Sequence, residues 1–167
     1  MKMTIRKLTA LFLVITATAV CAQEPPTTIY GEVGQLPLVV RFSDTSKVTP
    51  KLVRSLIGIN ITENFAVEGV LGVTLNKDEA VTATMAGTFL KSHLAINEDV
   101  TFFGRLGVNR TMLGGVANGS ITRTAYGIGL QTQLTKDFYG QLDYMIYGKS
   151  PNSESVRGAT FSIGTRF

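Results

Sequence analysis

The sequence predicts an all-β chain: an eight-stranded antiparallel up-and-down barrel that crosses a membrane with its strands and fills its lumen with side chains. Three observations lead to this fold class. Runs of about ten residues rich in Val, Ile, Phe, Tyr and Thr alternate with turn-forming segments. Within most of these runs, uncharged positions alternate with polar ones, which gives each strand two different faces. Short turns alternate with longer loops, as they do in barrels that span a membrane.

Composition excludes several other classes of protein. The chain has 167 residues, of which 17% are charged and 44% hydrophobic, so it is too apolar for a disordered protein. One cysteine, Cys21, and one histidine, His93, cannot build a disulfide framework, a thiolate zinc site or a multi-histidine metal site. No apolar run reaches the roughly 18 residues of a spanning helix. We therefore expect no metal and no cofactor.

The first part of the chain has the pattern of a cleaved signal peptide. It opens with three basic residues, Lys2, Arg6 and Lys7. An uncharged, mostly apolar stretch follows over residues 8–20, and small residues stand at the recognition positions before a cut after Ala22. We expect residues 1–22 to direct export through the Sec pathway and residues 23–167 to form the barrel.

Two other interpretations of this segment are weaker. A lipidated Cys21 would need a smaller residue than Val20 before it, and Pro25 and Pro26 would end a buried N-terminal helix abruptly. Loss of the leader removes three of the 16 basic residues and leaves 13 against 12 acidic ones, a net charge of +1. The high isoelectric point belongs mainly to the leader, so nucleic acid is not an expected partner.

The predicted strands follow one another as hairpins. They lie near residues 28–36, 51–61, 65–75, 81–96, 100–110, 123–134, 138–148 and 158–167. Tight turns at 62–64, 97–99 and 135–137 alternate with longer polar loops at 43–50, 76–80, 112–122 and 149–157. Pro37 cannot donate a ladder hydrogen bond, so it should mark a rim, a bulge or the end of the first strand. In the fourth strand the apolar residues change phase, and a bulge near Phe89 would reconcile them.

The two faces of the strands decide between two geometries. In six of the predicted strands, one face carries no charged residue at any of 31 positions. A soluble barrel or sandwich would turn this face inward, whereas a membrane barrel turns it outward to lipid. The strands have about the 9–11 residues that a tilted membrane strand needs. Aromatic residues near the tight turns and chain ends predict an interfacial girdle of Phe65, Phe102, Phe138, Tyr139, Tyr30 and Phe167.

Lipid also requires the sheet to close and the lumen charges to pair. Hydrocarbon offers no partner to an open sheet edge. Eight strands close a barrel narrow enough for side chains to fill, so we expect no open pore. The other face carries the charges Glu32, Arg54, Glu68, Arg105, Asp143 and Arg166, and an unpaired charge there would be costly. Because the first and last strands become neighbours on closure, we expect a contact between Glu32 and Arg166.

Four cations stand at the bases of the longer loops. They are Arg110, Arg123, Lys149 and Arg157. If these loops face outward, the four side chains could bind lipopolysaccharide phosphates. The alternative is that they are rim charges that hold the apolar band in register with the membrane. A catalytic role has little support, because Ser92 and His93 are adjacent and point to opposite faces of a strand.

Three segments carry a resemblance to a known family. The C-terminal run from Gly158 to Phe167 alternates and ends on an aromatic residue, and it resembles the assembly signal of bacterial outer-membrane barrels, with Phe161, Ile163 and Phe167 in its apolar phase. Segments 57–69 and 96–107 resemble hairpins of the opacity-protein and outer-membrane-protein-A-type barrels. The resemblance implies a Gram-negative outer-membrane location, insertion by the barrel-assembly machinery, and outer-membrane lipid and lipopolysaccharide as surroundings; we expect a monomer.

The resemblance also bears on function. Some relatives act in adhesion or in resistance to host defence through long surface loops, whereas the longest predicted loop here, 112–122, is short. A structural or surface-interaction role without catalysis is therefore the expected function. One alternative is an outer-membrane lipid-modifying hydrolase, although the sequence after His93 lacks the serine of the His-x-Ser motif found in some lipid A deacylases. Another is a soluble periplasmic barrel that binds a small apolar ligand.

Overall fold

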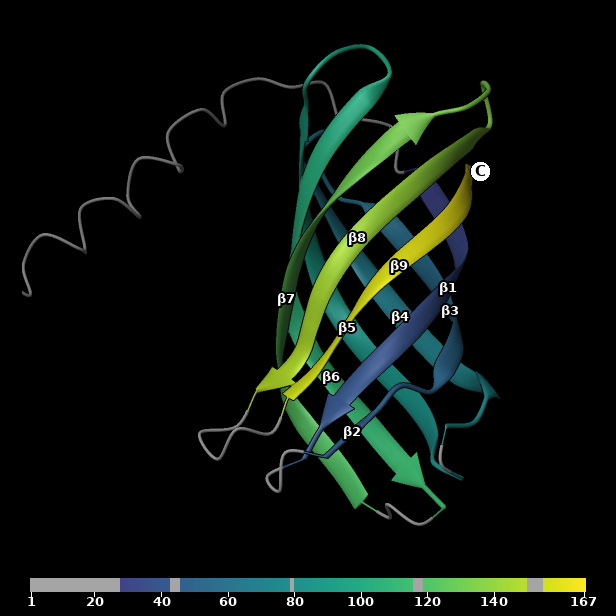
Figure 1. The fold of residues 1–167 in the computed structure, drawn as a ribbon. Helices are drawn as coiled ribbons and strands as arrows, with labels where there is room; N and C mark the ends of the chain where they lie inside the picture. The colour runs from purple at the N-terminus through teal and green to yellow at the C-terminus, as the bar shows by residue number, and fades with distance from the viewer. Residues whose placement is uncertain (1–27, 43–45, 79, 116–118, 150–154) are drawn as a thin grey trace, which may run out of the picture.

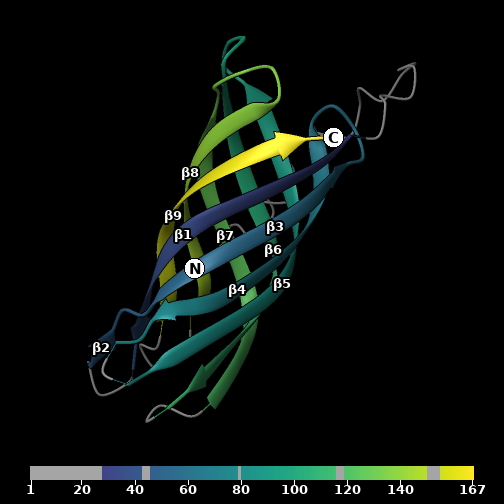
Figure 2. The same cartoon turned by 90° about the vertical axis from the view of Figure 1, so that its right-hand side faces the viewer.

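The computed structural model is a closed antiparallel barrel (Figures 1 and 2). It describes residues 28–42, 46–78, 80–115, 119–149 and 155–167. The predicted signal peptide, 1–22, lies outside the described residues. The strands are β1 (Ile29–Arg41), β2 (Lys47–Val48), β3 (Lys51–Asn60), β4 (Phe65–Asn76), β5 (Thr82–Ala95), β6 (Val100–Gly114), β7 (Gly119–Gln133), β8 (Phe138–Lys149) and β9 (Ser155–Arg166).

Closure is made by the first and last long strands. Consecutive strands pair antiparallel, and β1 pairs with β9 from Tyr30 opposite Arg166 to Arg41 opposite Ser155. The two-residue β2 pairs only with the last two residues of β1, so eight long strands form the wall. The tight turns and the C-terminus lie at one end of the barrel, at the top of Figure 1. We call this the turn end and the opposite end the loop end. The predicted fold class is confirmed.

Several predicted boundaries need correction. β1 does not end at residue 36 but continues through Pro37 to Arg41, and Pro37 is its last residue paired with β3. β6 and β7 extend to Gly114 and from Gly119, so most of the predicted loop 112–122 is strand. Pairing between β7 and β8 stops at Tyr126, which leaves the β6–β7 hairpin projecting at the loop end (Figure 1).

The bulge predicted near Phe89 is absent from the ladders of β5. Its register with β4 and β6 is continuous through Phe89 and Leu90. Phe89 is buried in the lumen, whereas Leu90 and Leu94 point outward and are exposed. The strand needs no irregularity because a barrel lumen can hold apolar side chains as well as polar ones.

The apolar faces of the strands point outward. Ile57, Leu71 and Ile128 are 66%, 64% and 57% exposed, which is the transmembrane orientation and not that of a soluble core. Phe65, Phe102, Phe138 and Phe167 are exposed near the turn end, as predicted for the girdle. The prediction was wrong for Tyr30 and Tyr139, which are buried in the lumen. The described residues contain no helix long and apolar enough to cross a membrane.

The lumen is divided into an apolar half and a polar half. The apolar half lies toward the loop end, and its buried members include Leu36, Leu38, Val40, Leu52, Val81, Met85, Met145, Tyr147 and Val156. The polar half lies toward the turn end and contains buried Glu32, Glu68, Lys91, Arg105, Gln141 and Asp143. Side chains of both kinds fill the interior, so the expectation of a filled lumen is confirmed.

The outward orientation gives a first test. We expect Leu71→Arg, near the middle of the apolar band, to lower the free energy of unfolding in lipid vesicles by about 2–4 kcal/mol, because a cation there must enter hydrocarbon. The measurement is urea unfolding followed by fluorescence or circular dichroism. Asn76→Arg, on an exposed residue at the loop end of the same strand, is the matched control and should change stability little. Equal effects of the two variants would contradict the lipid-facing orientation.

Candidate functional site

The polar half of the lumen is organised around one guanidinium group. Arg105 projects inward from β6, and its partners come from β1, β4 and β8. Its Nε lies 2.5 Å from Glu68 Oε2, its Nη1 2.7 Å from Asp143 Oδ2, and its Nη2 3.3 Å from Glu32 Oε2. All four side chains are buried. Three strands that are distant in the sequence are therefore tied to β6 across the lumen.

A second guanidinium extends this network toward the apolar half. Arg54 of β3 donates from Nη1 to Asp143 Oδ1 at 3.0 Å and from Nη2 to Asp143 Oδ2 at 2.5 Å. Its Nη1 also donates to the hydroxyl of Tyr147 at 3.1 Å. Asp143 thus lies between two arginines, and both of its oxygens accept charge-assisted hydrogen bonds, the strongest kind available to a carboxylate.

Lys91 is a charged member of the network that was not predicted from the sequence. Its Nζ lies 3.8 Å from both Glu32 Oε1 and Glu68 Oε1 and donates to the side-chain oxygens of Gln131 and Gln141 at 3.2 and 3.3 Å. It also stands 4.5 Å from the centre of the Phe103 ring. Lys91 lies on the same face of β5 as Met85 and Phe89, and this shared alternation is the sequence feature that could have placed it in the lumen. With Lys91 included, three carboxylates face three cations and the network is formally neutral.

Two buried tyrosines complete the hydrogen bonding of the carboxylates. The hydroxyl of Tyr30 donates to Glu68 Oε1 at 2.7 Å, and that of Tyr139 donates to Glu32 Oε1 at 3.1 Å. Their rings lie over glycines of the neighbouring strands, Tyr30 over Gly58 and Tyr139 over Gly164, where any Cβ would overlap the ring. These glycines therefore allow aromatic rings to turn into the lumen and away from the girdle.

The predicted contact between Glu32 and Arg166 was wrong. No ion pair joins them, although both belong to the described residues. The ladder pairs Arg166 with Tyr30 and Glu32 with Gly164, so Glu32 lies two residues deeper in the barrel. Arg105 and Lys91 reach Glu32 from across the lumen instead. Arg166 is exposed at the rim, donates to Gln133 Oε1 at 2.7 Å and stands 5.0 Å from the centre of the Tyr139 ring. The other five predicted lumen charges do form the network.

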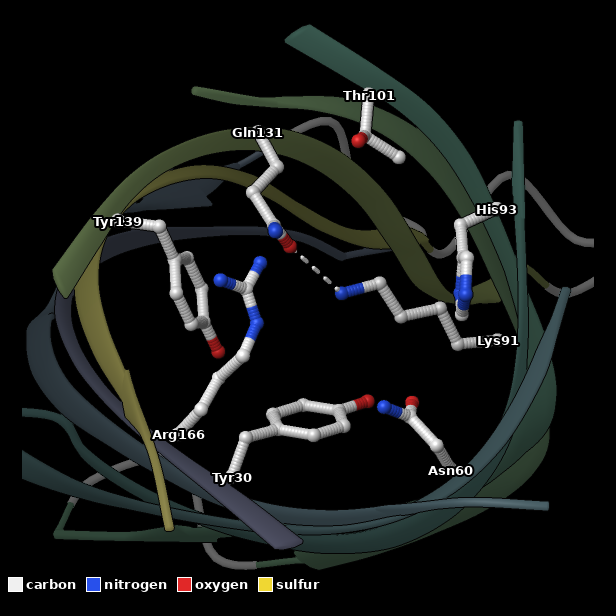
Figure 3. A pocket seen from close by; sticks show the side chains of 8 residues that line it. All are labelled: Tyr30, Asn60, Lys91, His93, Thr101, Gln131, Tyr139 and Arg166. Carbon is white, nitrogen blue, oxygen red and sulfur yellow. Dashed lines mark hydrogen bonds between the residues drawn. The ribbon is translucent and has the colours of Figure 1, made fainter. Parts of the chain in front are cut away.

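A small polar hollow opens at the turn end above the network (Figure 3). Its volume is about 140 Å³, and it is lined by Tyr30, Asn60, Lys91, His93, Thr101, Gln131, Tyr139 and Arg166. We call it the vestibule. The network forms its floor, so the vestibule does not continue through the barrel. His93 lines it, whereas Ser92 is exposed on the outer face of the same strand, which confirms that the two side chains diverge.

The remaining predicted site residues lie on the outer surface and at the loop end. Arg110, Arg123, Lys149 and Arg157 are all exposed, and they come from four consecutive strands, β6, β7, β8 and β9. Phe161, Ile163 and Phe167 are exposed and share the outward face at the C-terminus. The structure therefore does not gather either set into a pocket. Among the described residues no cluster of His, Cys, Asp or Glu could hold a metal ion.

The network gives a second test. We expect Arg105→Gln to lower the free energy of unfolding by about 3–5 kcal/mol, because it leaves buried carboxylates without their main counter-charge. Arg166→Gln is the control: this exposed side chain has the hydrogen bond to Gln133 and the contact with the Tyr139 ring but no ion pair with any described residue, so stability should change by no more than about 1 kcal/mol. Denaturant unfolding in detergent micelles measures both. Equal losses in the two variants would show that the network does not support the barrel.

Comparison with known proteins finds similarity at the level of the fold. No protein-family model matches the chain, and no curated protein matches it in sequence. Among solved structures, Ail of Yersinia pestis is similar over 84% of this chain and 99% of its own, with 18% identity and a TM-score of 0.61. The N-terminal β-barrel domain of Pseudomonas aeruginosa OprF covers 87% and 100%, with 14% identity and a TM-score of 0.62.

A third solved structure agrees with these two. The outer-membrane protein OprG of Pseudomonas aeruginosa is similar over 87% of this chain and 98% of its own, with 11% identity and a TM-score of 0.61. Identities this low carry information on the fold alone. The chain therefore has the fold of the small eight-stranded outer-membrane barrels, as the resemblance in its sequence implied.

Proposed function

We propose that this chain is an integral outer-membrane barrel with a structural or surface-interaction role, and that it neither conducts solutes nor catalyses a reaction. The proposal rests on one combination of features: the outer band is apolar, and both halves of the lumen are filled with side chains. The neutral ion-pair network closes the turn-end half, and packed apolar side chains close the loop-end half. Because the lumen is filled, the barrel can contact other molecules only through its two rims and its outer surface.

The two rims carry opposite charge. At the turn end the described turns contain Glu63, Glu98, Asp99 and Asp137 against the cation Lys136, and the exposed Arg166 adds a second cation to this rim. At the loop end the described residues include eight cations, Arg41, Lys47, Lys51, Lys77, Arg110, Arg123, Lys149 and Arg157, against the anion Asp78. This polarity supports an orientation with the loop end in the outer leaflet, where cations can bind lipopolysaccharide phosphates.

The alternatives find less support. A hydrolase built on Ser92 and His93 is disfavoured because these side chains lie on opposite faces of β5. A soluble carrier of an apolar ligand is disfavoured because the apolar positions point outward and the lumen is filled. The exposed aromatic and aliphatic residues at the C-terminus, Phe161, Ile163 and Phe167, support recognition by the barrel-assembly machinery during insertion.

Fractionation and gel mobility test the membrane assignment. We expect the expressed full chain in the outer-membrane fraction, and the unheated protein should migrate faster than the boiled protein because a closed barrel stays folded in detergent. Purified protein in planar bilayers should show no steady conductance, since both halves of the lumen are filled. A water-soluble periplasmic product, or a stable open channel, would contradict the proposal.

A charge-removal variant tests the role of the loop-end cations. Lipopolysaccharide should raise the melting temperature of the wild-type barrel, because a ligand that binds only the folded state stabilises it. Combined Gln substitution of Arg110, Arg123, Lys149 and Arg157 should abolish most of this rise. The control neutralises the turn-end acids Glu63, Glu98, Asp99 and Asp137 and should retain it. If the four cations serve only as rim charges, both variants will keep the full rise.

A further inference from the structure

The lipid-facing surface of β3, β4, β5 and β6 is not smooth but contains an open hollow. Its volume is about 520 Å³, and its lining is mainly apolar. Ser55, Gly69, Ala86 and Thr88 provide small side chains in the lining, and Ile57, Leu71 and Val108 provide large ones. We call this feature the outer groove. It lies within the apolar band, where lipid chains surround the barrel.

Strand register explains why the groove forms here. Two neighbouring rows of outward side chains cross the four strands. One row runs Ile57, Gly69, Thr88, Val108, and the next runs Ser55, Leu71, Ala86, Arg110. In the first row Gly69 and Thr88 are paired, and in the second Ala86 stands beside Leu71, so small side chains lie between larger ones. A Cβ placed on Gly69 would meet nothing within 4 Å, so the space over it is empty of protein.

A cation lies at the edge of this apolar groove. Arg110 lines it from β6 and is exposed, and its guanidinium makes no ion pair or hydrogen bond with any described residue. Its height can be derived from strand geometry. Arg110 lies ten residues after Val100, the first residue of β6. At a rise of about 3.4 Å per residue and a strand tilt of about 40°, it stands roughly 26 Å from Val100 along the barrel axis. An apolar band is about 25 Å tall, so Arg110 stands at the level of the outer phosphates.

We propose that the outer groove binds one acyl chain of the lipid A part of lipopolysaccharide, with a lipid A phosphate held by Arg110. The apolar lining fits a hydrocarbon chain, and the free guanidinium fits the anion at the head of that chain. Thr122, which is paired with Arg110 and also lines the groove, can donate a hydroxyl hydrogen bond to the same phosphate. This inference rests on the proposed outer-membrane location and specifies one lipid site within it.

A second hollow on the outer surface provides an internal comparison. It has a volume of about 400 Å³ and lies near the turn end, between β1, β3, β8 and β9, with Gly31, Val33 and Phe138 in its lining. No cation lines it. An acyl chain could lie there too, but nothing would select a phosphate-bearing lipid. Of the two hollows, the outer groove combines an apolar lining with a free cation, Arg110.

Two variants test the groove from its two ends. Gly69→Leu fills the lining without a clash, because the space over Gly69 is empty, and Arg110→Gln removes the phosphate contact. Lys136→Gln is the matched control, because Lys136 is an exposed cation at the turn end that lines neither hollow. Gly31→Leu fills the second hollow as a steric control. Heat-dependent gel mobility verifies that each variant is folded.

The readout is the retention of purified bisphosphorylated lipid A by the detergent-solubilised barrel, counted by native mass spectrometry. We expect one retained lipid A on the wild type and about tenfold weaker retention in Gly69→Leu and in Arg110→Gln, which corresponds to about 1.4 kcal/mol each. Lys136→Gln and Gly31→Leu should retain lipid A like the wild type. Dephosphorylated lipid A should bind the wild type as weakly as Arg110→Gln binds the phosphorylated form.

The outcomes separate this inference from the proposed function. If lipid A is retained equally by wild type and Gly69→Leu, the groove is not the site and the inference fails, while the membrane assignment stands. If Arg110→Gln and Lys136→Gln weaken retention equally, retention follows the total charge of the barrel and not a site at Arg110, and the inference again fails. A disulfide-linked dimer formed by Gly69→Cys in membranes would assign the groove to a second copy of the chain. A soluble wild type would overturn both proposals.

Discussion

Closure of the sheet between β1 and β9 is the constraint on which the other features of this barrel depend. Inside a membrane, a backbone N–H or C=O without a partner has no water to bind, so an open edge strand would cost several kcal/mol per group. The β1–β9 ladder removes that edge. Closure also separates two environments, because each strand must then point alternate side chains to lipid and to a narrow lumen. The charges that lipid excludes are collected in that lumen, where they must find partners.

Arg105 shows how the partners are supplied. No single neighbouring strand provides them; its carboxylates come from β1, β4 and β8 across the interior. Such a buried network does not by itself make a protein more stable than apolar packing would, but removal of one member is costly. The network and the apolar half of the lumen have different effects on the barrel. The network ties distant strands together by directional hydrogen bonds, whereas the apolar half excludes water.

The outer surface of the barrel also varies, both in shape and in charge. The band is uniform in hydropathy but not in shape, because Gly69, Ala86 and Thr88 leave a hollow among the larger side chains of Ile57, Leu71 and Val108. Exposed cations gather at the loop end and exposed acids at the turn end, so the two rims differ in charge. A cylinder with a closed lumen can still be specific through such surfaces, since lipids contact it along its full height.

Alternation of apolar and polar residues was enough to predict the fold class, the strand order, the tight turns and the outward direction of the apolar faces. It also predicted five of the six lumen charges. These properties follow from local rules: a strand has a period of two, and a one-residue slip would turn every side chain to the wrong solvent. Lys91 and the buried direction of Tyr30 and Tyr139 were not predicted. Apolar and aromatic residues also occupy lumen-facing positions of these strands, so alternation alone does not show there which face points inward.

Pairing of the lumen charges and the outer groove depended on tertiary structure alone. Sequence places Glu32 and Arg166 on adjacent strands, but the β1–β9 register sets them two residues apart in depth, and side chains from the far wall reach Glu32 first. The groove likewise needs the registers of β3, β4, β5 and β6 together to bring small residues side by side. Alternation fixes the face on which a side chain lies, whereas closure and register fix its neighbours, because those come from strands far away in the chain.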